Sequence, residues 1–368
     1  MGGREDGLQS RSIALSRPCS GASKGMELHQ KDQSASRLVE LDALRGLAAL
    51  AVVMYHYTTF YGQQIGHVQP MQLGFAAGNY GVHLFFLISG FVIFMTLERT
   101  GSVRSFLVSR FSRLYPGYWA ALIVTAAVVY SIGLPVQRLD GHDLALNTTM
   151  AQQILGAEHL DGSYWTLQVE LFFYIQMMFW MLLLRLRHIH LVIAGWLLMA
   201  VVYNYTVQHD WHFSYLVREV LVLRYIPFFA MGILFYRLYS QRAETRLNLG
   251  MIGLCLIAVA SARQEVITLV ALVCCAIFGL FVTGRLGWLR GRVFAYLGAV
   301  SYSLYLLHQA IGIALIHRIE HVGLPSSLAV LMTLAIVLAL ATVLAYGVER
   351  PATRWIRRRW LVPAAVEG

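Results

Sequence analysis

The sequence predicts an all-α, polytopic membrane protein with about ten transmembrane helices and both termini in the cytoplasm. Apolar residues make up 58% of the 368 residues, and charged residues make up only 13%, about half of the roughly 25% usual in soluble domains. The apolar residues gather in long runs, and the basic residues lie between those runs. This composition excludes an ordinary cytosolic enzyme and a nucleic-acid-binding module, although the formal net charge is +10.

A polar segment precedes the apolar runs. Residues 1–38 are rich in Ser, Gly and charge and lack the apolar core of a signal peptide, so we expect a disordered cytoplasmic tail. Residues 39–360 are the predicted transmembrane domain, and 361–368 form a second cytoplasmic tail. A span needs about 20 residues, and ten runs approach that length: 41–60, 80–97, 117–132, 165–184, 191–207, 220–236, 247–262, 266–283, 296–316 and 328–348.

Basic residues between the runs predict the orientation. With the N-terminus inside, 24 Arg and Lys residues fall in cytoplasmic segments and four fall outside. One further arginine, Arg224, lies within a run. Because basic loops stay in the cytoplasm, this alternation favours ten spans with both ends inside.

The four cysteines predict neither a metal site nor a disulfide framework. Cys19 lies in the polar tail, whereas Cys255, Cys274 and Cys275 lie in apolar runs, and no C-x-x-C spacing occurs. We therefore expect no metal.

The first run carries two ionisable residues on one helix face. Arg45 and His56 are eleven residues apart, which is close to three helical turns and about 16 Å along the axis. Arg45 is thus expected near the cytoplasmic surface, with Asp42 in reach as a partner. His56 is expected deeper in the membrane, where ionisable residues usually mark function.

Two further groups of charged residues stand out. Arg110 and Arg113 share one side of a helix and are expected at the cytoplasmic N-terminus of the third span, a position that favours anions. Glu170 lies among aromatic residues near the outer start of the fourth span, one turn after Thr166. The alternatives are a positive-inside anchor for the arginines and a structural ion pair, with Arg224 or another cation, for Glu170.

Other polar residues in the spans are compatible with helix packing or with a substrate channel. Ser89 and Gly90 permit close helix approach, and Arg224 can extend its charge to the outer surface. In the ninth span Ser301, Tyr305 and His308 form one polar stripe. Packing and channel lining remain open for all of them.

Five motifs in order resemble the signature of the acyltransferase-3 family of bacterial integral membrane O-acyltransferases. They are R-G-x-A followed by His56, F-F-x-I-S-G-F at 85–91, R-x-x-R-x-x-P at 110–116, W-T-L-x-x-E at 165–170 and Y-S-x-Y-x-x-H at 302–308. The resemblance covers roughly residues 38–356, with Glu349-Arg350-Pro351 near its end. Thr166 replaces the serine that is more usual in the fourth motif.

The resemblance implies an enzyme that moves an acyl group, usually acetyl, from cytoplasmic acyl-CoA to a hydroxyl of a glycan or lipid-linked sugar. It implies a multi-pass protein of the bacterial inner membrane, with no permanently bound cofactor, no nucleic acid partner and room for a separate periplasmic partner protein. Arg110 and Arg113, with Arg45, would hold the phosphates of CoA. His56 would act as general base, and Glu170 would orient it.

Several points stay open at this level. The channel candidates are Ser89, Trp165, Arg224, Tyr305 and His308, and a covalent acyl-enzyme on Ser89 or His56 is an alternative to direct transfer. The acceptor could instead be a small molecule such as a macrolide. From other classes, a secondary transporter or an inactive relative would share the charged spans, but no internal repeat supports transport.

Overall fold

The computed structural model describes residues 39–71, 74–100, 102–184, 186–211, 213–240 and 244–361. The described residues contain helices and turns but no strand, which confirms the all-α prediction. The predicted tails 1–38 and 361–368 lie outside the described residues except for Leu361, so neither is tested. The chain is therefore an all-α polytopic membrane protein, as the helices below show.

Helices occupy all ten predicted runs. The first covers residues 39–55 and continues through a π-helical turn, η1 (His56–Phe60), into α2 (Tyr61–Gln64). The others are α3 (Gly81–Thr100), α4 (Val103–Ile132), α6 (Trp165–Leu184), α7 (Ile189–Gln208), α9 (Ile226–Ser240), α10 (Thr245–Ala260), α11 (Glu265–Val282), α12 (Arg292–His321) and α13 (Ser326–Leu344).

Shorter elements connect these helices. They are η2 (Ala76–Tyr80), η3 (Pro135–Gln137), α5 (Gly141–Asn147), η4 (Gly162–Tyr164), α8 (Tyr215–Val220), η6 (Gly287–Arg290), η7 (Ala345–Glu349) and α14 (Arg350–Leu361). In the described part of the chain, seven helical stretches are long and apolar enough to cross a membrane, and α9 and α10 are shorter apolar helices. That ten helices cross, with both termini inside, stays a prediction.

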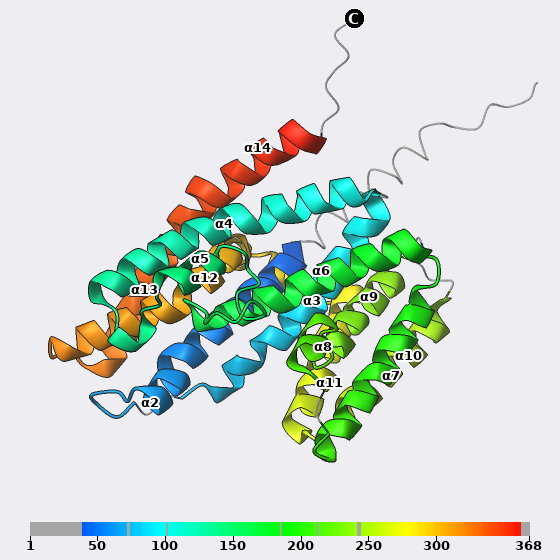
Figure 1. Cartoon of the computed structure of the whole chain (residues 1–368), viewed down its shortest axis with the longest axis horizontal. Coiled ribbons are helices and arrows are strands. Elements are labelled where there is room, and N and C mark those ends of the chain that lie inside the picture. Colours follow the sequence, from blue (N-terminus) through cyan, green and yellow to red (C-terminus); the bar gives the residue numbers. More distant parts are fainter. Residues whose placement is uncertain are drawn as a thin grey trace, which may run out of the picture.

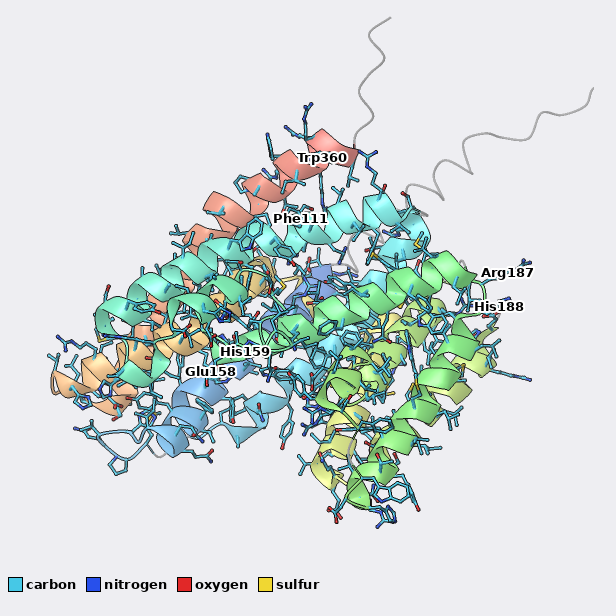
Figure 2. All side chains as sticks on the ribbon, in the orientation of Figure 1. Phe111, Glu158, His159, Arg187, His188 and Trp360 are labelled. Atoms are coloured by element: carbon cyan, nitrogen blue, oxygen red, sulfur yellow. The ribbon has the colours of Figure 1, made fainter. Side chains whose placement is uncertain are left out.

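The helices form two groups on either side of α3. One group contains α4, α12, α13 and α14, and the other contains α7, α9, α10 and α11 (Figure 1). Helix α3 packs along α9, and α12 packs against both α13 and α4. The turn between α6 and α7 carries Arg187 and His188 at the edge of the molecule (Figure 2).

Glycines allow α3 and α9 to touch through their backbones. A Cβ atom added at Gly90 would lie 2.1 Å from the carbonyl oxygen of Phe229, and one added at Gly232 would lie 2.1 Å from that of Leu87. Both distances are far below van der Waals contact. The helices can therefore pack this closely only because neither position has a side chain, as the small-residue interfaces of membrane helices require.

We expect Gly90→Ala to destabilise the protein, by roughly 1–3 kcal/mol, because the methyl group must separate α3 from α9. Thermal unfolding of the purified protein in detergent measures the change. The matched control is Gly195→Ala in α7, where an added Cβ meets no atom within 4 Å. Equal melting temperatures for the two variants would show that the close contact is not required.

Helix α4 begins much earlier than its apolar run. It starts at Val103, with the Ser102 side chain accepting from the backbone N–H of Ser105, and continues through Pro116. Proline lacks the N–H that would bond to the carbonyl oxygen of Ser112. The Thr353 hydroxyl of α14 donates to that oxygen instead, at 2.6 Å. The terminal helix thus repairs the hydrogen bond that Pro116 removes.

Candidate active site

A cavity of about 430 Å³ lies between the first helix, α3, α4, α6, α12 and α14. We call it the arginine cavity, because its lining includes Arg45, Arg110, Arg113, Arg350 and Arg357. Of the residues predicted from sequence, Arg45, Arg110, Arg113, Ser89, Glu170 and Tyr305 line it. Residues predicted from distant parts of the chain therefore share one space.

The five arginines differ in their partners. Arg45 pairs with Asp42 at 3.1 Å, as predicted, and Arg113 pairs with Glu349. Arg110 donates to the hydroxyl of Thr96 at 3.2 Å. Among the described residues, Arg350 and Arg357 also contact neutral groups and form no ion pair. The cavity therefore keeps positive charge that an anionic ligand can neutralise.

Helix α14 supplies two of these arginines. Arg350, Thr353 and Arg357 line the cavity, and their spacing places them on one face of the helix. Arg357 donates to the hydroxyls of Ser112 and Ser109, both at 3.3 Å, and the guanidinium of Arg350 lies 4.1 Å from the centre of the Tyr346 ring. The hydroxyls fix Arg357 without neutralising its charge.

The expectation that Arg110 and Arg113 lie at a helix N-terminus is wrong. Helix α4 starts at Val103, so both side chains project from its interior, and free backbone N–H groups do not contribute there. The pair also differs in its chemistry. Arg113 is bound to Glu349, whose other oxygen accepts from Ser303 at 2.9 Å. Arg110 instead donates to the Thr96 hydroxyl and lies 5.8 Å from the ring centres of Phe106 and Tyr174.

Glu170 forms its hydrogen bonds inside the cavity. Its Oε1 atom accepts from the Ser89 hydroxyl at 2.8 Å and from the Tyr174 hydroxyl at 2.6 Å. Within the described part of the chain, Glu170 has no hydrogen bond to His56. The structure thus joins Ser89 to Glu170, and it gives the predicted general base a different partner.

That partner is His308. The Nδ1 atom of His56 lies 2.9 Å from the carbonyl oxygen of Val52 and 3.2 Å from Nε2 of His308. The Nδ1 atom of His308 lies 2.7 Å from the carbonyl oxygen of Tyr305. Because a carbonyl oxygen only accepts, each Nδ1 carries its hydrogen, and Nε2 of neutral His308 accepts from His56. This pattern assigns the free lone pair of His56 to Nε2, as a general base requires.

Side chains hold the part of α12 that carries His308. Tyr57 donates to the carbonyl oxygen of His308 at 3.0 Å, and Tyr164 donates to that of Leu306 at 3.2 Å. Asp161 accepts from the backbone N–H of Ala310 at 2.7 Å. Burial raises the pKa of Asp161, while the hydrogen bonds from Ala310 and Ser163 act in the opposite direction. The loop before α6 therefore fixes the position of His308.

The first helix and α12 approach so closely that Gly46, the residue after Arg45, has no room for a side chain. A Cβ atom at Gly46 would lie 2.5 Å from the carbonyl carbon of Leu297, and one at Gly298 would lie 2.5 Å from the carbonyl oxygen of Asp42. The first helix and α12 therefore cross in backbone contact at the arginine cavity. This crossing brings Asp42 and Arg45 to the cavity wall.

Tyr305 stands between the cavity and the two histidines. Its ring lies 5.3 Å from Phe85 and 5.2 Å from His308, centre to centre, and its hydroxyl accepts from Thr166 at 2.9 Å. Tyr305 lines the cavity, whereas His56 and His308 are not among the lining residues. A thioester in the cavity would thus meet Tyr305 before it meets His56.

The two remaining candidates lie elsewhere. Trp165 begins α6, and its ring centre is 5.4 Å from that of Tyr225. Arg224 was expected within the sixth run, but it lies in the turn 221–225 before α9, and its side chain is exposed. The helix starts later because Pro227 suits a first helical turn. An ion pair between Arg224 and Glu170 does not occur among the described residues.

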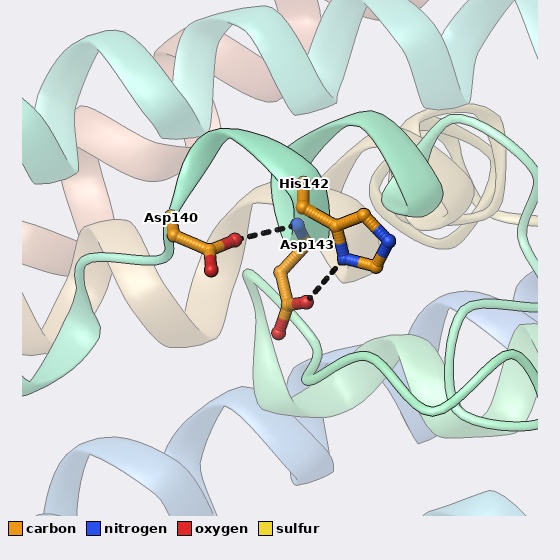
Figure 3. A group of neighbouring side chains, drawn as sticks. All are labelled: Asp140, His142 and Asp143. Carbon is orange, nitrogen blue, oxygen red and sulfur yellow. Dashed lines mark hydrogen bonds and ion pairs between the residues drawn. The ribbon is translucent and has the colours of Figure 1, made fainter.

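Three further side chains have the donor atoms of a metal site. Asp140, His142 and Asp143 converge at the start of α5 (Figure 3). Their contacts explain the geometry without an ion, since Asp140 caps the helix by accepting from the N–H of Asp143 at 2.7 Å. Asp143 also accepts from the N–H of Glu158 at 3.0 Å and lies 3.3 Å from His142. The group therefore serves to tie a loop.

Sequence reasoning missed several residues of this site. Glu349, Arg350 and Arg357 were noted only within a closing motif or as basic residues, and Tyr174 and Asp161 were not singled out. A buried carboxylate at the end of the last apolar run was the available signal for Glu349. The spacing of Arg350, Arg354 and Arg357, which places them on one side of a helix, was the signal for Arg357.

The fold and the cavity define a multi-pass membrane protein with an internal, positively charged site beside a histidine pair, in which His308 is buried and His56 is half-buried. Comparison with known sequences then gives the family. The model of the acyltransferase-3 family, described as an acyltransferase domain, matches residues 38–349. The chain belongs to this family.

Three relatives are similar to this chain, and two of them are named as acyl- or acetyltransferases. The "Acyltransferase MdmB" of Streptomyces mycarofaciens is 29% identical over 162 residues, 40% of each chain. The "Protein 2 in picA locus" of Rhizobium radiobacter is 38% identical over 116 residues, 29% of this chain and 56% of the relative. The "Putative acetyltransferase ORF330" of Acidianus two-tailed virus is 24% identical over 72% of this chain and 80% of the relative.

The alignments cover about half, or less, of the first two relatives. No solved structure matches the chain significantly.

Proposed function

We propose that this protein is an O-acyltransferase of the bacterial inner membrane that moves an acyl group, most simply acetyl, from cytoplasmic acyl-CoA to a glycan hydroxyl. The observation that carries the proposal is the arginine cavity, which lies beside the His56–His308 pair in a chain of the acyltransferase-3 family. The cavity suits an anionic donor, and the pair supplies a base for a hydroxyl acceptor.

The donor would enter at the end of the cavity that carries the arginines. CoA bears phosphate groups, and guanidinium groups bind phosphates through paired hydrogen bonds. Arg110, Arg350 and Arg357 have neutral partners in the described chain, so they are the better candidates. Arg113 is already neutralised by Glu349, and we assign it a structural role. The pantetheine arm would point along the cavity toward Tyr305.

The transfer itself would use His56 as general base. Its Nε2 atom takes the proton of the acceptor hydroxyl while the oxygen attacks the thioester carbonyl carbon. The C–S bond breaks, the acyl group remains on the oxygen, and the CoA thiolate recovers the proton from His56. His308 accepts from Nδ1–H of His56 and so stabilises the imidazolium that forms, a role like that of the carboxylate in hydrolytic triads.

A covalent intermediate on Ser89 is the competing route. The Ser89 hydroxyl lines the cavity and donates to Glu170, as a nucleophile with an adjacent base would. Brief reaction with radiolabelled acetyl-CoA followed by acid quenching separates the routes. Label retained on the protein and lost in Ser89→Ala would favour the acyl-enzyme, whereas unlabelled protein that turns over would favour direct transfer.

We expect Arg357→Gln to weaken CoA binding about tenfold, because one charged hydrogen-bond partner of a phosphate is worth roughly 1.5 kcal/mol. Isothermal titration of the purified protein with CoA measures the change, and added salt should weaken the wild type more than the variant. Arg354→Gln is the matched control, since Arg354 lies on α14 but does not line the cavity. Equal affinities for both variants would contradict a donor site at this mouth.

The function as a whole is tested in cells and with purified protein. Mass spectrometry of surface glycans should show that acyl groups are lost when the gene is deleted and return when it is restored. Purified protein should release free CoA thiol from acetyl-CoA when a glycan acceptor is present. Unchanged glycans together with no thiol release would refute the proposal, and movement of substrate without thiol release would favour a transporter.

A further inference from the structure

A second and larger cavity, of about 820 Å³, lies at the start of α3 and α6, which also line the arginine cavity, and beside α7, α9, α10 and α11. Val82 and His83, in the first turn of α3, line it, whereas residues 85–95 of α3 line the arginine cavity. Its other walls come from the end of α7, the start of α9 and the turn between α10 and α11. These ends are predicted to face the outside, so we call it the outer cavity.

The outer cavity combines aromatic walls with polar groups of both kinds. Five of its residues present aromatic rings: Tyr80, Trp165, Tyr203, Tyr225 and Phe228. The polar lining includes one guanidinium, one carboxylate, one imidazole and four amides: Arg224, Glu265, His83, Asn79, Asn204, Gln208 and Gln264. The arginine cavity, in contrast, has five arginines. The arginine cavity suits a ligand with several phosphates. The outer cavity, with a single arginine, suits a ligand with less negative charge.

Arg224 and Glu265 leave their charges available. Both side chains are exposed, and neither forms an ion pair within the part of the chain that the structure describes. The guanidinium of Arg224 lies 5.9 Å from the centre of the Tyr225 ring. The cavity thus offers a strong donor and a strong acceptor that a ligand can use.

The amides add acceptors to this set. Asn204 uses its NH₂ group to donate to the carbonyl oxygen of Ala258 at 3.0 Å and to the hydroxyl of Ser261 at 2.9 Å. Gln208 donates to the carbonyl oxygen of Ser261 at 2.6 Å. These bonds join α7 to the end of α10. They use both N–H groups of Asn204 and one N–H of Gln208, which leaves both amide oxygens as acceptors for a ligand.

A sugar ring matches this lining. Its C–H faces pack on aromatic rings, and its hydroxyls both donate and accept, so it can use a guanidinium, a carboxylate and amide oxygens together. The rings of Trp165 and Tyr225 lie 5.4 Å apart with an interplanar angle of 34°, which gives a broad apolar wall. A lipid chain would leave the polar groups without partners.

One aromatic layer separates the two cavities. Phe86 lines the arginine cavity, and its ring centre lies 4.8 Å from that of Tyr225 and 6.1 Å from that of Trp165. Both of those residues line the outer cavity. A donor and an acceptor that bound in the two cavities would therefore approach each other from opposite sides of this layer.

We propose that the outer cavity is the acceptor site and that it binds a saccharide, with the ring against Trp165 and Tyr225 and the hydroxyls on Arg224 and Glu265. The acceptor role rests on the proposed function, but saccharide binding can be measured without turnover. Trp165 and Arg224 then act in acceptor recognition, away from the arginine cavity.

Saturation-transfer NMR of the full chain in detergent tests the site. The probes are the methyl glycosides of glucose, rhamnose and N-acetylglucosamine, titrated without acetyl-CoA. We expect binding of at least one glycoside, weakened about tenfold or more in Arg224→Gln, Glu265→Gln and Trp165→Ala. The first two replace exposed side chains, so the test survives if Trp165→Ala does not fold.

Matched controls are Arg318→Gln and Trp288→Ala, which replace exposed residues that do not line the outer cavity. They should bind the glycosides like the wild type. No binding by the wild type, or equal binding by all variants, would overturn the saccharide site. Binding without acylation when acetyl-CoA is added would leave the site standing and refute the proposed function instead. If the three variants acylate a glycoside as well as the wild type does, the proposed function stands and only the saccharide site is refuted.

Discussion

The His56→Ala variant should lose acyl transfer by a factor between roughly 10² and 10⁴, the contribution typical of a general base. The loss follows from the lone pair on Nε2, which the hydrogen bonds of Nδ1 to Val52 and His308 leave free. The effect should fall mainly on kcat, because His56 does not line the arginine cavity. Steady-state kinetics with acetyl-CoA and the acceptor, measured on purified protein, give both parameters.

The control for this experiment is His188→Ala. His188 is an exposed histidine in the turn between α6 and α7 (Figure 2) and does not line the arginine cavity, so its loss should not change the rate. His308→Ala should retain more activity than His56→Ala, since it removes only the orienting partner. Full activity in a folded His56→Ala protein would exclude His56 as the base and would favour the Ser89–Glu170 pair.

The helices could be predicted from sequence because hydropathy acts locally. Every predicted run contains a helix, although residues 221–225 of the sixth run form a turn. An apolar segment of this length has few other ways to satisfy its backbone in a membrane. The ends were less predictable. Helix α4 extends beyond its run because Ser102 caps it and Thr353 replaces the hydrogen bond lost at Pro116, and Thr353 lies more than 200 residues away.

Many residues of the site could be predicted from the sequence, but the contacts between them could not. Charged and polar residues in or beside the apolar runs were singled out individually because their presence there is costly, and six of the ten candidates for catalysis, donor binding and the channel line one cavity. Which side chain meets which depends on the rotation and crossing of helices. The His56–His308 contact joins residues 252 apart, so a pairing of His56 with Glu170 was as compatible with the sequence as the pairing observed.

The Glu349→Ala variant should be the least stable single substitution in the arginine cavity. Glu349 is 2% exposed and binds both Arg113 and Ser303, so its loss leaves a guanidinium without its counter-charge. Removing one partner of a buried ion pair costs about 3–5 kcal/mol, and we expect the lower end, roughly 3 kcal/mol, because the Arg113 side chain is 32% exposed. Thermal unfolding in detergent measures the loss.

Two comparisons separate the charge from the packing. Glu349→Gln keeps the shape and can still accept from Ser303 but removes the charge, so it should be destabilised nearly as much if the ion pair dominates. The double variant Arg113→Met, Glu349→Leu should recover much of the stability, because replacing both partners removes the unpaired charge. If Glu349→Ala melts like the wild type, Arg113 does not depend on Glu349. In that case it would be available, like Arg110 and Arg357, to bind the phosphates of the donor.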